Sequence, residues 1–256
     1  MADFVNTIDI IGDDPLTDSI ITRSIVEYKD NNLTKIGDYA LYDCSNLTSV
    51  DFPAVTSIGT QAFSKCTKLT SVDFPAVTSI DSGVFYGCSN LTSVDFPALT
   101  TITGSAFSNC TNLTSVNFPV VTTINDSVFS YCTNLTSVDF PVVTTINDSV
   151  FSYCTNLTSV DLGASSSIGR YAFYNCSKLK TLILRKSTTN CSLYDTTTVF
   201  SGTPFASGTG YIYVPAARVD SYKTATNWKN YAARFRVLED YTVDGTTTGK
   251  LDPTKI

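Results

Sequence analysis

The chain has 256 residues, which at roughly 150 residues per domain favours one or two domains, and we expect one. Charged residues make up 16% of it, against about 25% in a typical soluble protein, whereas 39 threonines and 29 serines supply a surface of hydroxyl groups. Histidine is absent and glutamate occurs only as Glu27 and Glu239, so the commonest general bases and zinc ligands are missing. The net charge of −6 argues against a nucleic-acid partner. We therefore expect a protein that is not an enzyme.

The N-terminal segment from Met1 to Pro15 contains acidic residues and no Lys or Arg, unlike the cationic start of a secretory signal. No window approaches the roughly 18 apolar residues that cross a bilayer. We expect neither a signal peptide nor an anchor in this chain, and no membrane insertion. The cellular location is left open.

A repeat of 22 residues dominates the chain. Leucine and cysteine both recur at this spacing, at Leu47, Leu69, Leu91, Leu113, Leu135, Leu157 and Leu179, and at Cys44, Cys66, Cys88, Cys110, Cys132, Cys154 and Cys176. The 22 residues from Phe118 to Asp139 are repeated unchanged from Phe140 to Asp161. Such a period is typical of a solenoid in which each unit contacts only its neighbours.

One unit predicts one strand and one return path. Residues 47–52 (LTSVDF) end in the apolar–polar alternation of a short strand with one buried face. Pro53 then ends the strand, because proline cannot donate a ladder hydrogen bond. The return path carries Val55, Ile58, Phe63 and Cys66 at short, irregular spacings, which favours turns or 3₁₀ pieces over a full helix.

The unit L-x-x-V-x-F-P-x-V-x-x-I-x-x-x-A/V-F-x-x-C resembles the BspA-like, Treponema-type class of bacterial leucine-rich repeats, in register over residues 25 to 184. The segment from Tyr211 to Pro215 and the following Val219 to Lys223 are also similar to the closing segment of such arrays in gut bacteria. The resemblance implies an α/β solenoid, a right-handed leucine-rich repeat with a parallel β-sheet on its concave face. It also implies adhesion or protein binding at a bacterial surface.

The ends of the array depart from the repeat, and terminal repeats of solenoids are usually atypical caps. We expect an N-terminal cap in residues 1–24, the repeat array in 25–184, an irregular last coil with a helical C-terminal cap in 185–240, and a flexible tail in 241–256. A last strand is expected from Tyr211 to Val214, followed by a helical stretch after Pro215. Trp228 is expected to pack against the final coil.

The seven periodic cysteines form a single file, which cannot bring four ligands to one point as zinc requires. We expect them to be buried, reduced and inert, with no bound metal and no cofactor. Cys191 lies outside the file and is the candidate for a reactive or bridging thiol.

The candidate binding surface is a strip of hydroxyl and carboxylate groups on the predicted strands. Its residues are Ser71, Asp73, Ser93, Asp95, Ser115, Asn117, Ser137, Asp139 and Asp161. Stacked strands place successive acids about 5 Å apart, so the acidic file either attracts a cation or basic partner or is relieved by solvent. A neighbouring threonine file, including Thr70 and Thr92, adds hydroxyls suited to a carbohydrate or an extended peptide. No catalytic site is expected.

The recurring Asn-Leu-Thr sequence, as at Asn112 and Asn134, is interpreted as a turn in which the asparagine bonds the local backbone. The leading hypothesis is a monomeric, non-catalytic interaction module that binds a protein or carbohydrate ligand. The alternative is a phage-encoded or structural host-recognition or spacer protein of the same fold, which would lie on a virion.

Overall fold

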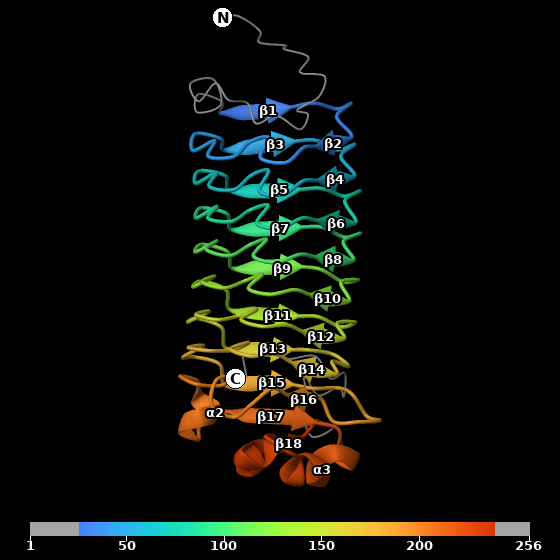
Figure 1. Ribbon diagram of the computed structural model, residues 1–256, viewed down its shortest axis with the longest axis vertical. Coiled ribbons are helices and arrows are strands. Elements are labelled where there is room, and N and C mark those ends of the chain that lie inside the picture. Colours follow the sequence, from blue (N-terminus) through green and yellow to red (C-terminus); the bar gives the residue numbers. More distant parts are fainter. Residues whose placement is uncertain (1–25, 239–256) are drawn as a thin grey trace, which may run out of the picture.

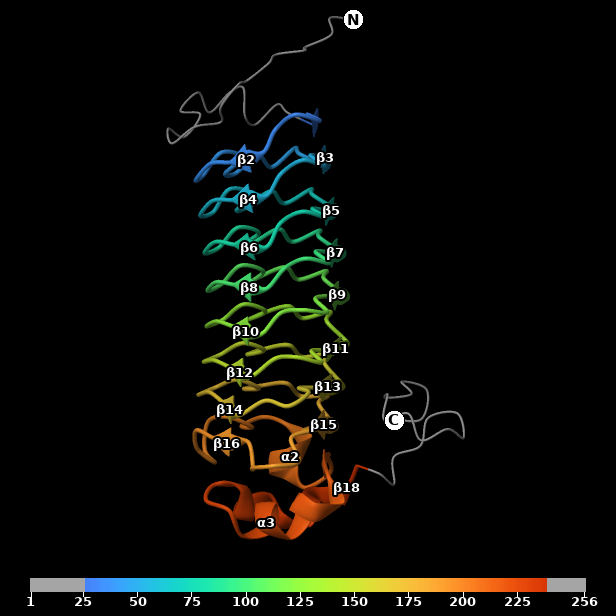
Figure 2. The same cartoon turned by 90° about the vertical axis from the view of Figure 1, so that its right-hand side faces the viewer.

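The computed structural model describes residues 26–238 of the chain. Over this range the backbone winds into a stack of similar coils, one beneath the other (Figure 1). Each coil of the array contributes a strand of three residues to one side of the stack and a strand of two residues to another (Figure 2). We call these the front strands and the rear strands.

The front strands pair in parallel. They are β1 (Glu27–Lys29), β3 (Ser49–Asp51), β5 (Ser71–Asp73), β7 (Ser93–Asp95), β9 (Ser115–Asn117), β11 (Ser137–Asp139), β13 (Ser159–Asp161), β15 (Thr181–Ile183), β17 (Tyr211–Val214) and β18 (Phe235–Val237). Their ladders form three groups, β1 with β3, β5 to β9, and β11 to β18. Within the array each residue pairs with the one 22 positions on, as Val72 does with Val94. The predicted period and strand are therefore confirmed, as is the strand from Tyr211 to Val214 (β17), although it is not the last, because β18 follows and pairs with it.

The rear strands form one parallel sheet. They are β2 (Lys35–Ile36), β4 (Ser57–Ile58), β6 (Ser79–Ile80), β8 (Thr101–Ile102), β10 (Thr123–Ile124), β12 (Thr145–Ile146), β14 (Ser167–Ile168) and β16 (Ser192–Leu193). The expected 3₁₀ pieces are wrong here, because the described coils return through these strands and turns. The physical reason is the repeat itself, which places each Thr-Ile or Ser-Ile pair beside its equivalent in the next coil.

Phenylalanine fills the interior in two parallel files. Phe63 stacks on Phe85 with ring centroids 5.3 Å apart and an interplanar angle of 9°. Phe74 stacks on Phe96 at 5.6 Å in the other file. Such offset aromatic pairs contribute about 0.5–1.5 kcal/mol beyond the burial of their area. Because each coil from Phe52 to Phe151 adds the same pair of rings, the core has the same composition along this part of the stack.

The segments that lead from each rear strand into the next front strand form what we call the turn edge. They are residues 37–48, 59–70, 81–92, 103–114, 125–136, 147–158 and 169–180. Each contains two residues with positive φ, such as Ser127 at 59° and Tyr131 at 61°. This conformation aims their N–H groups at the next coil, where they donate to the carbonyl oxygens of Asp148 at 2.9 Å and Ser152 at 2.8 Å.

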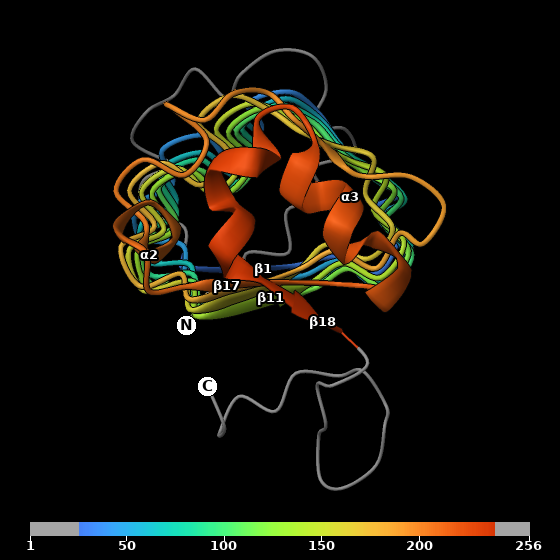
Figure 3. The same ribbon diagram turned by 90° about the horizontal axis from the view of Figure 1, so that it is seen from below.

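Short helical segments follow the array. They are α2 (Pro204–Ser207), η1 (Ala216–Arg218), α3 (Val219–Thr224) and η2 (Trp228–Arg234). Figure 3 shows α3 lying across the end of the stack. Trp228 and Tyr231 contact Phe200 with ring centroids 6.0 and 5.3 Å away, and all three rings are buried. The expected N-terminal cap and C-terminal tail lie outside the described residues.

Candidate binding surface

The front strands present a flat row of polar side chains. In β5, β7 and β11 the central valine is buried while the serine and aspartate on either side are exposed, as strand alternation requires. The parallel register brings Asp73 beside Asp95 and Asp95 beside Asn117. Eight of the nine predicted site residues are exposed in this way, and they are Ser71, Asp73, Ser93, Asp95, Ser115, Asn117, Ser137 and Asp139.

Repulsion along the acidic file is interrupted at two places. The Asn117 side chain donates from Nδ2 to the Oδ1 atom of Asp95 at 3.1 Å. At the N-terminal end, Lys29 on β1 forms an ion pair with Asp51 on β3. The front strip is therefore not a uniform line of like charges, because an amide stands among its carboxylates and an ammonium group is paired at its N-terminal end.

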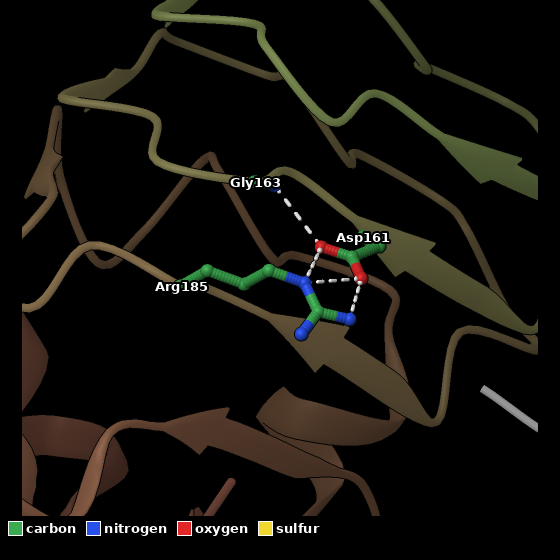
Figure 4. A network of polar contacts seen from close by, with 3 residues as sticks. All are labelled: Asp161, Gly163 and Arg185. Carbon is green, nitrogen blue, oxygen red and sulfur yellow. Dashed lines mark hydrogen bonds and ion pairs between the residues drawn. The ribbon is translucent and has the colours of Figure 1, made fainter. Parts of the chain in front are cut away.

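Asp161 corrects the prediction, because it is buried and does not belong to the exposed strip. Only 4% of the residue is accessible, and its carboxylate accepts hydrogen bonds from Nε of Arg185 at 2.8 and 3.1 Å (Figure 4). The Gly163 N–H donates to Oδ1 at 3.0 Å. Earlier coils have Phe-Pro after the strand, but here the chain reads Leu162-Gly163, and glycine supplies the N–H that proline lacks.

The flanking threonines have a role in the backbone ladder. Thr92 donates from Oγ1 to the carbonyl oxygen of Thr70 at 3.0 Å, and Thr158 donates to that of Thr136 at 3.0 Å. The same bond recurs along this file, so its hydroxyl protons are engaged between coils. These protons are therefore engaged, while the Oγ1 atoms can still accept a hydrogen bond from a ligand; the serines of the strip are not affected.

The asparagines of the Asn-Leu-Thr sequence bond to one another and not to the local backbone. Asn134 donates from Nδ2 to Oδ1 of Asn112 at 3.1 Å, and Asn156 donates to Asn134 at 3.1 Å. Lys178 ends the ladder with a bond of 2.8 Å to Oδ1 of Asn156. The sequence-based interpretation is wrong on this point, because the repeat places equivalent amides within reach of each other.

The seven cysteines of the file are free and buried, as predicted, and Cys191, the candidate for a reactive or bridging thiol, is free and buried as well. In the file, each thiol from Cys66 onward donates to a carbonyl oxygen of the preceding coil, as Cys88 does to Phe63 at 3.1 Å. Burial raises the pKa of Cys88 and of Cys191 to about 12, so both are protonated thiols near neutral pH. This makes Cys191 inert and removes the case for a reactive thiol.

Metal binding finds no support in the described part of the chain, residues 26–238. There, no group of three or more His, Cys, Asp or Glu side chains is placed to hold an ion. Within the same range no helix is long and apolar enough to cross a membrane.

The sequence reading missed a groove of about 440 Å³ over the rear strands, lined by Asp126, Asn147, Asp148, Ser192 and Tyr194 among others. Its carboxylates hold the backbone: Asp148 accepts the Arg170 N–H at 2.7 Å, and Asp126 accepts the Asp148 N–H at 3.1 Å. It forms where the coil lengthens after β14, a change that is visible in the sequence only as the loss of the 22-residue period.

Parallel coils of 22 residues, with leucine, isoleucine, phenylalanine and cysteine turned inward, define a leucine-rich-repeat solenoid. The chain belongs to the BspA-type leucine-rich repeat family, whose model matches in six copies over residues 11–135 and 78–202. The resemblance seen in the sequence is thereby confirmed. No curated protein matches the chain.

Solved structures of bacterial leucine-rich repeat proteins are similar to the chain. The Treponema pallidum leucine-rich repeat protein is 29% identical with a TM-score of 0.53, over 60% of this chain and 78% of its own. A leucine-rich repeat protein from Bacteroides ovatus is 27% identical with a TM-score of 0.49, over 66% of this chain. The match spans 54% of the length of the Bacteroides protein.

Proposed function

We propose that the chain is a non-catalytic interaction module that binds a protein or carbohydrate partner through the exposed front strip. Leucine-rich-repeat folds are typically interaction scaffolds. The observation that carries the proposal is the parallel register of β5 to β9, and of β11 with β13, which places serine hydroxyls and carboxylates in files on the front of the stack. A preorganised surface of this kind binds without the entropy cost of ordering a loop.

The chemistry of the strip favours a partner with hydrogen-bond donors or positive charge. Carboxylates accept but cannot donate, so Asp73, Asp95 and Asp139 suit hydroxyl, amide or ammonium groups. Histidine is absent and the threonine hydroxyl protons are engaged between coils, so a histidine-activated nucleophile has no counterpart here. Adhesion at a bacterial surface fits these properties.

We infer further that the coil is right-handed with the front sheet as its concave face, and that residues 185–238 cap the array. The packing of Trp228 and Tyr231 on Phe200 supports the cap, because it covers the ring file where the repeats stop. A covered edge favours a monomer, since open strand edges invite association.

The alternative, a spacer or host-recognition component of a virion, is favoured by one observation. The units 118–139 and 140–161 are identical in sequence and stack with the same geometry, as Phe129 and Phe151 show at 5.6 Å and 8°. Identical units lengthen a rod without changing its surface. The genes that flank this one distinguish the two roles, since tail genes support a virion and secretion genes support a cell surface.

The experiment that tests the interaction module compares the wild-type chain with the variant Asp73→Asn/Asp95→Asn/Asp139→Asn on arrays of purified proteins and glycans. We expect a ligand whose affinity falls at least about tenfold in the variant, which is roughly 1.4 kcal/mol. The matched control is Asp81→Asn/Asp126→Asn/Asp220→Asn, which changes the net charge equally away from the strip. A ligand bound equally by all three chains shows that the front strip is not the binding surface.

A further inference from the structure

Phenylalanine and tyrosine occupy different places in this protein. Every phenylalanine between residues 26 and 238 is buried. Half of the fourteen tyrosines lie instead on the turn edge, and they are Tyr39, Tyr42, Tyr86, Tyr131, Tyr153, Tyr171 and Tyr174. Because the core uses phenylalanine for burial, the tyrosines mark a surface on which an aromatic ring with a polar tip faces solvent.

Four of these rings form what we call the tyrosine cluster, which consists of Tyr131, Tyr153, Tyr171 and Tyr174. Tyr131 and Tyr153 stack face to face, with centroids 4.5 Å apart and an interplanar angle of 8°. Tyr174 meets Tyr153 edge-on at 5.4 Å and Tyr171 at 5.5 Å. The guanidinium of Arg170 lies 4.7 Å from the centre of the Tyr171 ring. The rings hold one another in place, so the cluster is rigid.

The backbone at three of the four cluster positions, Tyr131, Tyr153 and Tyr171, is one that tyrosine seldom adopts. Tyr131 and Tyr153 have φ values of 61° and 62°, in the left-handed region that favours glycine and asparagine. The equivalent residues in neighbouring coils are Gly87, Asn109 and Asn175, which suit this conformation. Folding alone therefore favours a smaller residue at both positions. Because this position has positive φ in every turn-edge segment, including at Lys65, the conformation belongs to the repeat, and what distinguishes these two coils is that tyrosine occupies it.

One face of the cluster is open. Tyr131 covers Tyr153 with one face, and the next residue up the same file is Asn109, whose side chain has no ring. Tyr131 is 42% exposed. The stack therefore ends in an aromatic ledge at the step between the coil of Asn109 and the coil of Tyr131.

Apart from Arg170 beside Tyr171, the groups next to the ledge along the chain are polar and uncharged. Tyr131 is flanked along the chain by Ser130, Thr133 and Asn134. Desolvation and the adjacent Tyr153 hydroxyl raise the pKa of Tyr131, so its phenol is protonated at neutral pH and can donate. Large exposed aliphatic side chains such as Val120 and Val142 lie outside the turn edge. Among the described residues, the large exposed hydrophobic side chains of the turn edge are all tyrosines, and they are Tyr39, Tyr86 and Tyr131.

We propose that the tyrosine cluster is a binding site for a neutral carbohydrate, with a pyranose ring packed on the open face of Tyr131 and its hydroxyl groups bonded to the phenols of Tyr131 and Tyr153. The C–H face of a sugar is apolar and slightly positive, which matches the negative face of an aromatic ring. Its hydroxyls match uncharged donors and acceptors. This site is separate from the front strip and goes beyond the interaction proposed for it.

The test is affinity electrophoresis of the full chain in native gels that contain hydroxyethylcellulose, galactomannan, arabinoxylan or amylopectin. We expect at least one of these neutral polysaccharides to retard the wild-type chain. In the variant Tyr131→Asn/Tyr153→Asn the dissociation constant for it rises at least about tenfold. Asparagine already stands at positions 109 and 175 of the same file, so this variant is expected to fold.

Two controls accompany it. Tyr194→Asn removes a tyrosine that is 59% exposed over the rear strands and leaves the retardation unchanged. The variant Asp73→Asn/Asp95→Asn/Asp139→Asn also keeps it, which separates this site from the front strip. No retardation of the wild-type chain by any of the four polysaccharides overturns the proposal, as does equal retardation of the double tyrosine variant. A protein ligand that depends on the two tyrosines, without any polysaccharide retardation, overturns the carbohydrate assignment.

Discussion

Arg185, two residues beyond β15, lies over the carboxylate of Asp161 at the end of β13 and closes the acidic file of the front strip. The side chain of Asp161 is 6% exposed and that of Arg185 is 32% exposed. A carboxylate this deeply buried depends on its partner, because an unpaired charge in the interior is costly. The exposed strip therefore ends at Asp139, the last residue of β11.

The first prediction is that Arg185→Met destabilises the protein by about 2–4 kcal/mol. The change leaves the Asp161 carboxylate buried, with the Gly163 N–H still donating to it. The double variant Asp161→Asn/Arg185→Met removes the charge as well and recovers part of the loss. Urea denaturation followed by circular dichroism measures both.

The matched control is the ion pair between Lys29 and Asp51, whose side chains are 64% and 54% exposed. Lys29→Met should change the free energy of unfolding by less than about 1 kcal/mol, because exposed pairs contribute little. Equal effects of Lys29→Met and Arg185→Met would show that burial of Asp161 is not what makes its partner matter.

Much of the fold can be predicted from the sequence, because one 22-residue pattern determines most of it. Leu47, Ile58, Phe63 and Cys66 are apolar in the repeat and buried in the structure. What the pattern does not reveal is which polar groups bond between coils, since this depends on distances of a few tenths of an ångström. For that reason the sequence does not distinguish threonine and asparagine side chains that bond between coils from ones that face a ligand or bond the local backbone.

The burial of Asp161 was missed although its signals stand in the sequence. Leucine and glycine replace Phe-Pro after it, and Arg185 follows 24 residues later. These signals predict burial only if residue 185 is known to lie beside residue 161. The 22-residue period, which would place it, is lost at this point of the chain. The tyrosine stack was likewise only partly visible, because residues 131 and 153 share the period while Tyr171 and Tyr174 do not.

The second prediction is that stability falls steeply above about pH 9. Burial raises the pKa of Cys88 and Cys191 from 9.0 to about 12, so the unfolded chain releases these protons at lower pH than the folded chain. Their contribution is complete below pH 9 and is lost as the pH rises toward 12, by about 1.4 kcal/mol per thiol and pH unit.

Thermal melts between pH 7 and pH 11 measure this dependence, and Cys88→Ala should reduce its slope. Thiol titration is the companion measurement. Fewer than two of the eight cysteines should react before denaturation and about eight after it. Several fast-reacting thiols in the native protein contradict the buried file.

The third prediction is that deletion of residues 118–139 leaves a folded protein. The unit that follows is identical, so residue 117 then joins the same sequence that it joined before. Phe107 gains Phe151 in place of Phe129 as its stacking neighbour, and the ring file continues. Circular dichroism and gel filtration should show the same fold in a shorter particle, and aggregation of the deletion variant would contradict the unit-by-unit interfaces.

The fourth prediction is that truncation before Pro215 causes aggregation. This change removes Trp228, which donates from Nε1 to the Cys191 carbonyl oxygen at 2.6 Å, and uncovers Phe200. It also removes β18, the parallel partner of β17. Light scattering should detect large particles, because apolar rings and a strand edge are exposed together. A soluble monomer of the truncated chain would show that these residues do not cap the array.

The fifth prediction concerns the acidic file itself. Asp73 and Asp95 are paired across β5 and β7, so their charges repel at strand spacing. Asp73→Asn removes this repulsion and offers Asp95 an amide, as Asn117 already does from the other side. We expect the free energy of unfolding to rise by about 0.2–1 kcal/mol, and to rise less at high salt because screening weakens the repulsion in the wild type. Asp81→Asn, on the turn after β6, serves as the control and should change the free energy of unfolding by less.

A calcium titration distinguishes repulsion from cation binding. If millimolar calcium raises the melting temperature of the wild type and not of Asp73→Asn, the file holds a cation. Each aspartate of the file has at most one acidic neighbour on either side, too few to hold a cation. We therefore expect calcium to change the melting temperatures of the wild type and of Asp73→Asn equally.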